Sequence, residues 1–103
     1  MKTHRSPQLG AALALVQLLQ EHPELPRATW TVDESTGTLH GHLHSGEFAP
    51  LNSYAEVLGG SIRPHKDFPL QGQMVRPHYL HAAWRDIPVE VVVVLPVPVA
   101  VAA

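Results

Sequence analysis

The chain has 103 residues, a formal net charge of −2 and no cysteine. Its length predicts one small domain, and a hydrophobic content of 45 % excludes a disordered chain. The lack of cysteine excludes disulfides, thiolate metal sites and a thiol nucleophile. The seven lysines and arginines are too scattered for a phosphate-binding surface, so we expect neither a nucleic-acid nor a membrane partner.

The first part of the chain predicts a helix from about residue 7 to residue 21. Ser6-Pro7 is typical of a helix start, because serine caps free amides and proline suits the first turn. Apolar residues then recur at helical spacing up to Pro23, which disfavours further helix. The residues expected on its buried stripe are Ala12, Leu15, Val16 and Leu19, with Leu13 and Leu18 beside them.

This apolar segment also has some features of a secretory signal, but the details favour a helix packed on a core. Gln17 interrupts the apolar run, and no small-x-small cleavage pattern follows it. No stretch of the chain approaches the ~20 apolar residues that span a membrane. We therefore expect a cytoplasmic protein.

Residues 28–32 and 38–44 predict the two strands of an antiparallel hairpin. Apolar and polar side chains alternate in both segments, and the intervening Asp-Glu-Ser-Thr-Gly at 33–37 is typical of a turn. Such alternation predicts one face toward a core and one face toward water.

A second helix is predicted after a loop at 45–51. Ser53 and Glu56 match a capping box, in which the serine accepts from a helical amide and the glutamate reaches back. Gly59-Gly60 supplies the stop, because glycine adopts a positive φ at little cost.

The remainder of the chain predicts strands. Residues 61–65 fit a short strand, residues 66–73 a loop, and residues 75–84 a longer strand that ends in a tight turn at Arg85-Asp86. The Val-rich run that follows, from Ile87 to Leu95, is the strongest strand signal in the chain. Pro96 is expected to end it and to leave residues 96–103 as a mobile tail.

These elements predict a single α+β domain over residues 1–103, with an ordered core from about 7 to 95. Their order is α-β-β-α-(β)-β-β. We expect two helices packed on one face of a mainly antiparallel sheet of four or five strands.

The layout resembles a group of small actinobacterial proteins of unknown function, some of them associated with plasmids or phages. The resemblance covers most of residues 9–95. It implies a compact α+β fold and transfers no catalytic residue. The matching segments are Leu25-Pro26 before Trp30-Thr31-Val32, Leu39-x-Gly41, Tyr54-Ala55-x-x-Leu58-Gly59-Gly60 and Trp84-Arg85-x-Ile87-Pro88-Val89-x-Val91.

The sharpest chemical feature is His40-x-His42-x-His44, whose side chains share one face of a predicted strand, about 7 Å apart. Two imidazoles at i and i+2 can reach one zinc, copper or nickel ion, and a histidine on a neighbouring strand would complete the set. The candidate ligands are therefore His40, His42 and His81. The alternative is that these histidines only occupy the wet face of a hairpin.

No pattern of catalytic residues appears, and we expect neither an enzyme nor a cofactor. The hypothesis is an interaction protein that binds an unknown protein partner or forms a homodimer, with Trp84, Tyr79 and Arg85 as interface candidates because such residues are enriched in hot spots. We expect the contact at an exposed strand edge or on the free sheet face. The alternative function is metal or small-ligand binding by the strand histidines.

Overall fold

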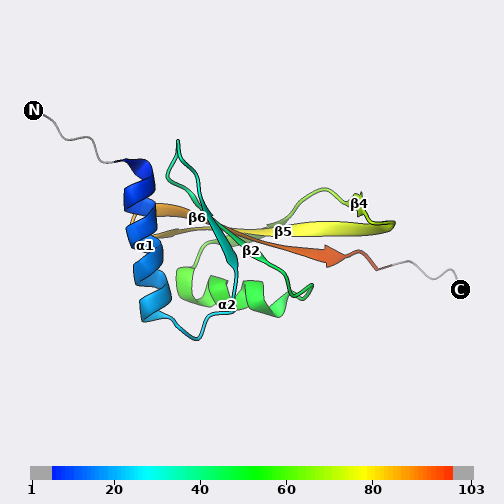
Figure 1. Cartoon of the computed structure of the whole chain (residues 1–103). Helices are drawn as coiled ribbons and strands as arrows, with labels where there is room; N and C mark the ends of the chain where they lie inside the picture. Colours follow the sequence, from blue (N-terminus) through cyan, green and yellow to red (C-terminus); the bar gives the residue numbers. More distant parts are fainter. Residues whose placement is uncertain (1–5, 99–103) are drawn as a thin grey trace, which may run out of the picture.

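The computed structural model describes residues 6–98, which form two helices and six strands (Figure 1). The predicted α+β class and the two helices are confirmed. In chain order the elements are α1 (Pro7–Glu21), β1 (Thr29–Val32), β2 (Leu39–Leu43), α2 (Ala49–Leu58), β3 (Ser61–Pro64), β4 (Phe68–Leu70), β5 (Gln73–Trp84) and β6 (Ile87–Pro96).

The strands form one mixed sheet in the order β1-β2-β6-β5-β3, and β4 pairs with the start of β5. All pairings are antiparallel except that between β2 and β6, which is parallel. The sheet thus has six strands, where four or five were predicted. The last strand inserts between β2 and β5, and this central position explains why the Val-rich run is the most apolar strand of the chain.

The first helix begins and ends near the predicted residues. The Ser6 hydroxyl accepts from the amide of Gln8 at 3.2 Å, and Pro7 occupies the first turn. At the other end, the amide of His22 donates to the carbonyl of Leu18 and closes the last turn.

The predicted start of the second helix is wrong by one turn. α2 begins at Ala49, with Pro50 in its first turn, so the loop predicted at 45–51 is shorter than expected. Ser53 lies inside the helix and donates its hydroxyl to the carbonyl of Ala49 instead of capping the helix. The earlier start places Leu51 and Tyr54 together in the core. Gly59, at φ 73°, ends the helix as predicted.

The segment predicted as a loop at 66–73 contains β4. The chain turns back at Gln71 and Gly72, which have φ values of 49° and 79°, and pairs Phe68 with Val75. Two successive residues at positive φ are typical of the tight hairpin turns that match strand twist. The predicted turn at Arg85-Asp86 has the same form, with φ values of 51° and 68°.

The C-terminal strand is slightly longer than predicted. Pro96 still belongs to β6, opposite Val75, and the amide of Val97 donates to the carbonyl of Met74. Residues 99–103 of the predicted mobile tail lie outside the described part of the chain.

The core lies on one side of the sheet. Val89, Val91 and Val93 of β6 are at most 2 % exposed, and alternation places them on the same face of the strand. They form one cluster with buried residues of both helices and of the neighbouring strands, which are Ala11, Ala14, Leu39, Leu43, Leu51, Tyr54 and Leu80.

Candidate functional site

The opposite side of the sheet carries most of the histidines. We call it the histidine face and define it by Thr29 and Thr31 of β1, His40 and His42 of β2, Glu90 and Val92 of β6, and Tyr79 and His81 of β5. The register aligns these residues in two rows across the strands. One row is Thr31, His40, Glu90 and His81, and the next is Thr29, His42, Val92 and Tyr79.

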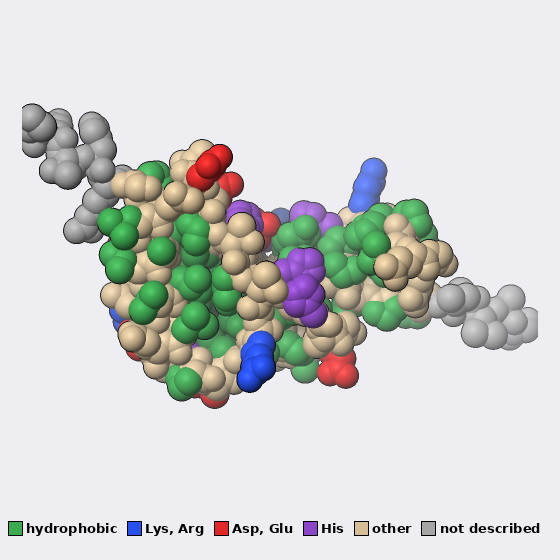
Figure 2. Space-filling model, in the orientation of Figure 1, with side chains coloured by type: hydrophobic (Ala, Val, Ile, Leu, Met, Phe, Trp, Pro, Cys, Tyr) green, Lys and Arg blue, Asp and Glu red, His purple; other side chains and the backbone are tan. Residues whose placement is uncertain are grey.

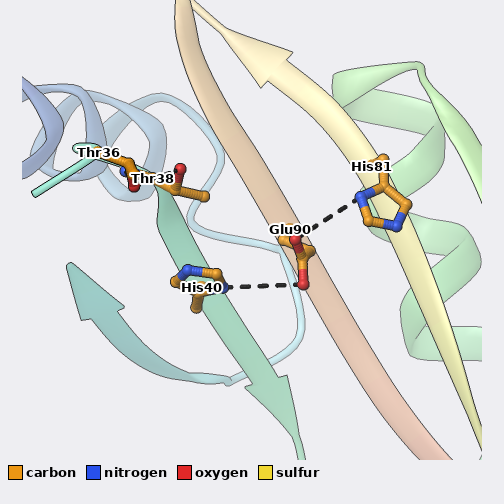
Figure 3. Close-up of polar contacts among 5 residues, drawn as sticks. All are labelled: Thr36, Thr38, His40, His81 and Glu90. Carbon is orange, nitrogen blue, oxygen red and sulfur yellow. Dashed lines mark hydrogen bonds and ion pairs between the residues drawn. The ribbon is translucent and has the colours of Figure 1, made fainter. Parts of the chain in front are cut away.

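Glu90 lies at the middle of the first row, on the central strand. One carboxylate oxygen is 3.9 Å from Nδ1 of His40, and the other is 3.7 Å from Nδ1 of His81 (Figure 3). The side chains remain open to water, at 42 % exposure for His40, 30 % for Glu90 and 47 % for His81. A carboxylate is therefore flanked by an imidazole from each neighbouring strand.

The second row is arranged differently. The ring of His42 stacks on that of His44, with centroids 4.7 Å apart, and Nε2 of His44 is 2.9 Å from the Thr29 hydroxyl. On the other side, the ring of Tyr79 packs beside two histidine rings, with its centroid 4.1 Å from that of His65 and 6.0 Å from that of His81.

A shallow basin of about 300 Å³ opens over these two rows. Its lining includes Thr29, Thr31, His40, His42, Tyr79, Glu90 and Val92. The basin therefore exposes hydroxyl, imidazole, phenol and carboxylate groups on one face. These groups suit a small polar ligand.

The three predicted metal ligands, His40, His42 and His81, do not point toward one common position. His40 and His81 share a row but stand on either side of β6, and His42 belongs to the next row. Among residues 6–98, no group of three His, Asp or Glu side chains is placed to hold a metal ion. Glu90, the acid between the two histidines, was not among the predicted site residues, because only the pairing of β6 with β2 and β5 brings it there.

Two of the three predicted interface residues, Trp84 and Arg85, make contacts within the chain. Trp84 donates its indole N–H to the carbonyl of Ala14 at 2.9 Å, and the Arg85 guanidinium lies 4.7 Å from the centre of the Trp84 ring. Arg85 also donates to Gln17 and Glu21 of α1. The third candidate, Tyr79, lies on the histidine face. Whether any of the three contacts another chain stays a prediction.

An exposed row of large apolar side chains on α1 was not predicted. We call it the α1 stripe, and it is visible along the outer side of α1 in Figure 2. Its large residues are about half exposed, at 49 % for Leu9, 50 % for Leu13, 49 % for Val16 and 46 % for Leu19.

The prediction of which α1 residues are buried was largely wrong. The buried positions are Ala11, Ala14 and Leu18, while Val16 and Leu19 of the predicted stripe face outward. Leu18 was correctly predicted beside the stripe, and Leu15 is partly buried against the core. Periodicity could not separate the two faces because the helix is apolar almost all round, and such helices are usually covered on every side.

No family model, no curated protein and no solved structure matches this chain significantly. The resemblance to the actinobacterial group therefore stays an expectation. No helix among residues 6–98 has both the length and the apolar character needed to cross a bilayer.

Proposed function

We propose that the protein is a non-enzymatic interaction protein that associates with a second copy of itself through the α1 stripe. The observation that carries this proposal is that Leu9, Leu13 and Val16 stay about half exposed on the face of α1 opposite its buried residues. Contiguous exposed apolar patches are typical of interaction surfaces in soluble proteins. Both helices are proposed to cover the same face of the sheet. Their buried residues belong to one core cluster, which supports this arrangement.

The charge of the stripe favours a second copy as its occupant. Leu9, Leu13 and Val16 lie opposite the buried face of α1, and no charged residue interrupts them. The one acid of the helix, Glu21, is paired with Arg85. Self-pairing therefore brings no like charges together, and the net charge of −2 gives only weak repulsion between copies. The stripe has no charged side chain that could pair with a charged partner.

The spacing of the stripe suits antiparallel pairing about a twofold axis. Leu9, Leu13, Val16 and Gln20 recur at intervals of three and four, so they lie on one line along the helix. If the twofold axis passes between Leu13 and Val16, Leu13 of one copy meets Val16 of the other, and Val16 meets Leu13. At each end of this contact, Leu9 meets Gln20 of the second copy, which lies just beyond the stripe. Such a contact is isologous, as most homodimer contacts are.

The size of the stripe predicts a weak dimer. Covering the exposed half of Leu9, Leu13 and Val16 contributes on the order of 2–5 kcal/mol per copy, and association costs an estimated 4–15 kcal/mol. A groove of about 400 Å³ next to the stripe enlarges the contact, since Leu19 lines it together with Leu25, Trp30 and Tyr54. We therefore expect a dimer that dissociates on dilution.

Sedimentation equilibrium between about 10 µM and 1 mM tests the proposal, because a weak dimer populates both species over that range. Wild type is expected to shift from monomer to dimer. Val16→Glu is expected to remain monomeric, because it places two like charges at the centre of the contact. The matched control is Met74→Glu, which changes a similarly exposed residue, 46 % against 49 % for Val16, at the end of β5 far from Trp84, and should still dimerise.

A strictly monomeric wild type at 1 mM would contradict the proposal, as would a dimer that Met74→Glu disrupts and Val16→Glu does not. Circular dichroism on each variant verifies that the fold is retained. The proposed location of the protein is the cytoplasm, which fractionation of the native host would check.

A further inference from the structure

We propose that the histidine face binds a small amphipathic amine, with the ammonium group at Glu90 and the apolar chain beside the C-terminal half of β6. The site consists of two adjoining basins. One is the basin of about 300 Å³ described above, which we call the polar basin, and the other, of about 460 Å³, we call the apolar basin. Neither is lined by a residue of the α1 stripe, so the site is separate from the proposed self-association.

The two basins share a wall formed by two histidines. His42 and His44 line both basins, and their rings stack with centroids 4.7 Å apart. A single ligand can therefore occupy both basins by passing this pair of rings. Small-molecule sites measure about 300–1,000 Å³ and combine apolar walls with a few polar groups. The two basins together have that size and that division of surface.

The apolar basin continues the histidine face toward the tip of the β4–β5 hairpin. Val94 and Pro96 of β6 line it, and they lie on the same side of the strand as Glu90 because alternate residues share a face. Phe68 and Leu70 of β4 line it as well, and their side chains are 38 % and 48 % exposed. Large apolar surface is therefore available here to cover the chain of a ligand.

Glu90 determines the charge of the polar basin. With the imidazoles uncharged, it is the only charged residue among those of residues 6–98 that line the basin. Its two carboxylate oxygens lie 3.9 Å from Nδ1 of His40 and 3.7 Å from Nδ1 of His81, which is beyond hydrogen-bonding distance (Figure 3). No lysine or arginine of the described chain forms an ion pair with it. The carboxylate therefore attracts a cationic ligand and repels an anionic one.

The groups around Glu90 suit an ammonium ion, which has three N–H donors and no acceptor. The Thr31 hydroxyl, in the same row as Glu90, and an unprotonated ring nitrogen of His40 can accept from it, as the carboxylate does. A primary ammonium group therefore finds an acceptor for each of its donors. The ring of Tyr79, in the next row, also lines the polar basin, and an aromatic face attracts a cation.

The spacing along β6 sets the length of the ligand. Glu90 and Val94 are four residues apart, which corresponds to about 13 Å at the rise of an extended strand. An ammonium group at Glu90 therefore needs an apolar chain of about that length to reach well into the apolar basin. Octylamine is a suitable probe, because its extended chain is close to this length and it stays monomeric at the concentrations of a titration.

NMR titration of the full-length protein at pH 7.5, where an ordinary imidazole is mostly uncharged, tests the site with three probes. Octylamine is expected to bind saturably at one site. Octan-1-ol lacks the charge and should bind about five- to tenfold more weakly. Butylamine keeps the charge but lacks four CH₂ groups, and it should bind at least about tenfold more weakly, because each buried CH₂ group contributes about fourfold. The amide shifts should centre on residues 90–94 and 68–70.

Two variants separate the contact with the ammonium group from the contact with the chain. Glu90→Gln should reduce the preference for octylamine over octan-1-ol to about twofold or less, and should leave the affinity for octan-1-ol unchanged. Leu70→Ala should weaken the binding of both ligands by about threefold. The matched control is Met74→Ala, because Met74 is exposed to a similar extent, 46 % against 48 % for Leu70, and lies on the other face of the same hairpin. This variant should bind both probes as wild type does.

Three results would overturn the site. One is equal affinity of wild type for octylamine and octan-1-ol, since Glu90 would then contribute nothing. Another is a set of amide shifts centred on the α1 stripe. The third is a loss of affinity in Met74→Ala as large as that in Leu70→Ala. The three variant positions are partly or fully exposed, so folding is expected to survive, and circular dichroism verifies it. Val16→Glu should bind octylamine with unchanged affinity, which distinguishes a failure of this site from a failure of self-association.

Discussion

The indole N–H of Trp84 donates to the backbone carbonyl of Ala14 at 2.9 Å, which ties the end of β5 to the middle of α1. Arg85 reinforces this connection, because its guanidinium lies over the Trp84 ring and donates to Gln17 and Glu21 of the same helix. The tight turn between β5 and β6 therefore holds α1 against the sheet. The opposite face of α1 is left exposed as a result.

Trp84→Phe should loosen this attachment. Phenylalanine keeps an aromatic ring at the position but removes the N–H donor, so we expect the free energy of unfolding to fall by about 1 kcal/mol. Urea denaturation measures this change. Amide hydrogen exchange should accelerate in α1 more than in α2, because only α1 loses a contact. Equal stability and unchanged exchange in α1 would show that the hydrogen bond does not hold the helix.

Gly41→Ala should be destabilising because of the ring of Trp30. Gly41 lies opposite Trp30 in the β1–β2 register, and a Cβ atom at Gly41 would stand 2.9 Å from two ring carbons of that tryptophan. The ring must shift, and it also packs edge-on against Tyr54, so movement is costly. We expect a loss of about 1–3 kcal/mol in the free energy of unfolding, measured by urea denaturation.

The control for this prediction is the same substitution in α1. A Cβ atom at Gly10 would meet only Ile87, at 3.9 Å, which is ordinary contact. Because glycine in a helix costs about 0.5–1 kcal/mol relative to alanine, Gly10→Ala should raise stability by that amount. If the two substitutions changed stability in the same direction, the contact between Gly41 and Trp30 would not explain the loss.

Local patterns identified most of the secondary structure in advance. The cap at Ser6, the stop at Gly59 and the turn at Arg85-Asp86 each depend on the chemistry of a few adjacent residues, and all three were predicted from the sequence. β4 was missed because its three residues include Pro69 and gain strand geometry only by pairing with β5. The parallel pairing of β2 with β6 is likewise tertiary, and no local pattern encodes it.

The candidate sites show the same division between local and tertiary information. Alternation correctly placed His40 and His42 on one polar face, but sequence alone could not show which strand lies beside β2. β6 takes that position, so Glu90 becomes the neighbour of His40, and His81 is one strand further away. On α1 an apolar face was evident, yet the side that meets the sheet depends on where Trp84 and Arg85 attach.

His78 should remain neutral to a lower pH than an ordinary histidine. Burial, and to a smaller extent the nearby charge of Arg76, lower the pKa of His78 below 6.5. The ring also packs edge-on against Phe48, at 5.7 Å between centroids. NMR titration should therefore give His78 a midpoint below 6.5, with its signal identified by its absence in His78→Gln.

The sign of the effect on stability follows from this shift. The pKa is lower in the folded state than in the unfolded chain, so the unfolded chain takes up the proton first as the pH falls. Stability that is present above about pH 6.5 is then lost below it. His78→Gln does not titrate and should lose less stability than wild type between pH 7 and pH 5. A midpoint at 6.5 or higher would contradict both expectations.

Asp33 should make the protein sensitive to strong acid. Its carboxylate accepts hydrogen bonds from the amide of Thr36 and from the hydroxyl and amide of Ser35, each at 2.9 Å, and these bonds lower the pKa of Asp33 from 3.8 to about 2. Because the folded-state pKa is depressed, the stabilisation is present above about pH 4 and is lost as the pH falls toward 2. Asp33→Asn should therefore show a smaller decline in the free energy of unfolding over that interval than wild type, measured by urea denaturation at successive pH values. Glu34→Gln, at the next position in the same turn, should decline as steeply as wild type, and an equally steep decline in Asp33→Asn would show that these bonds do not stabilise the turn.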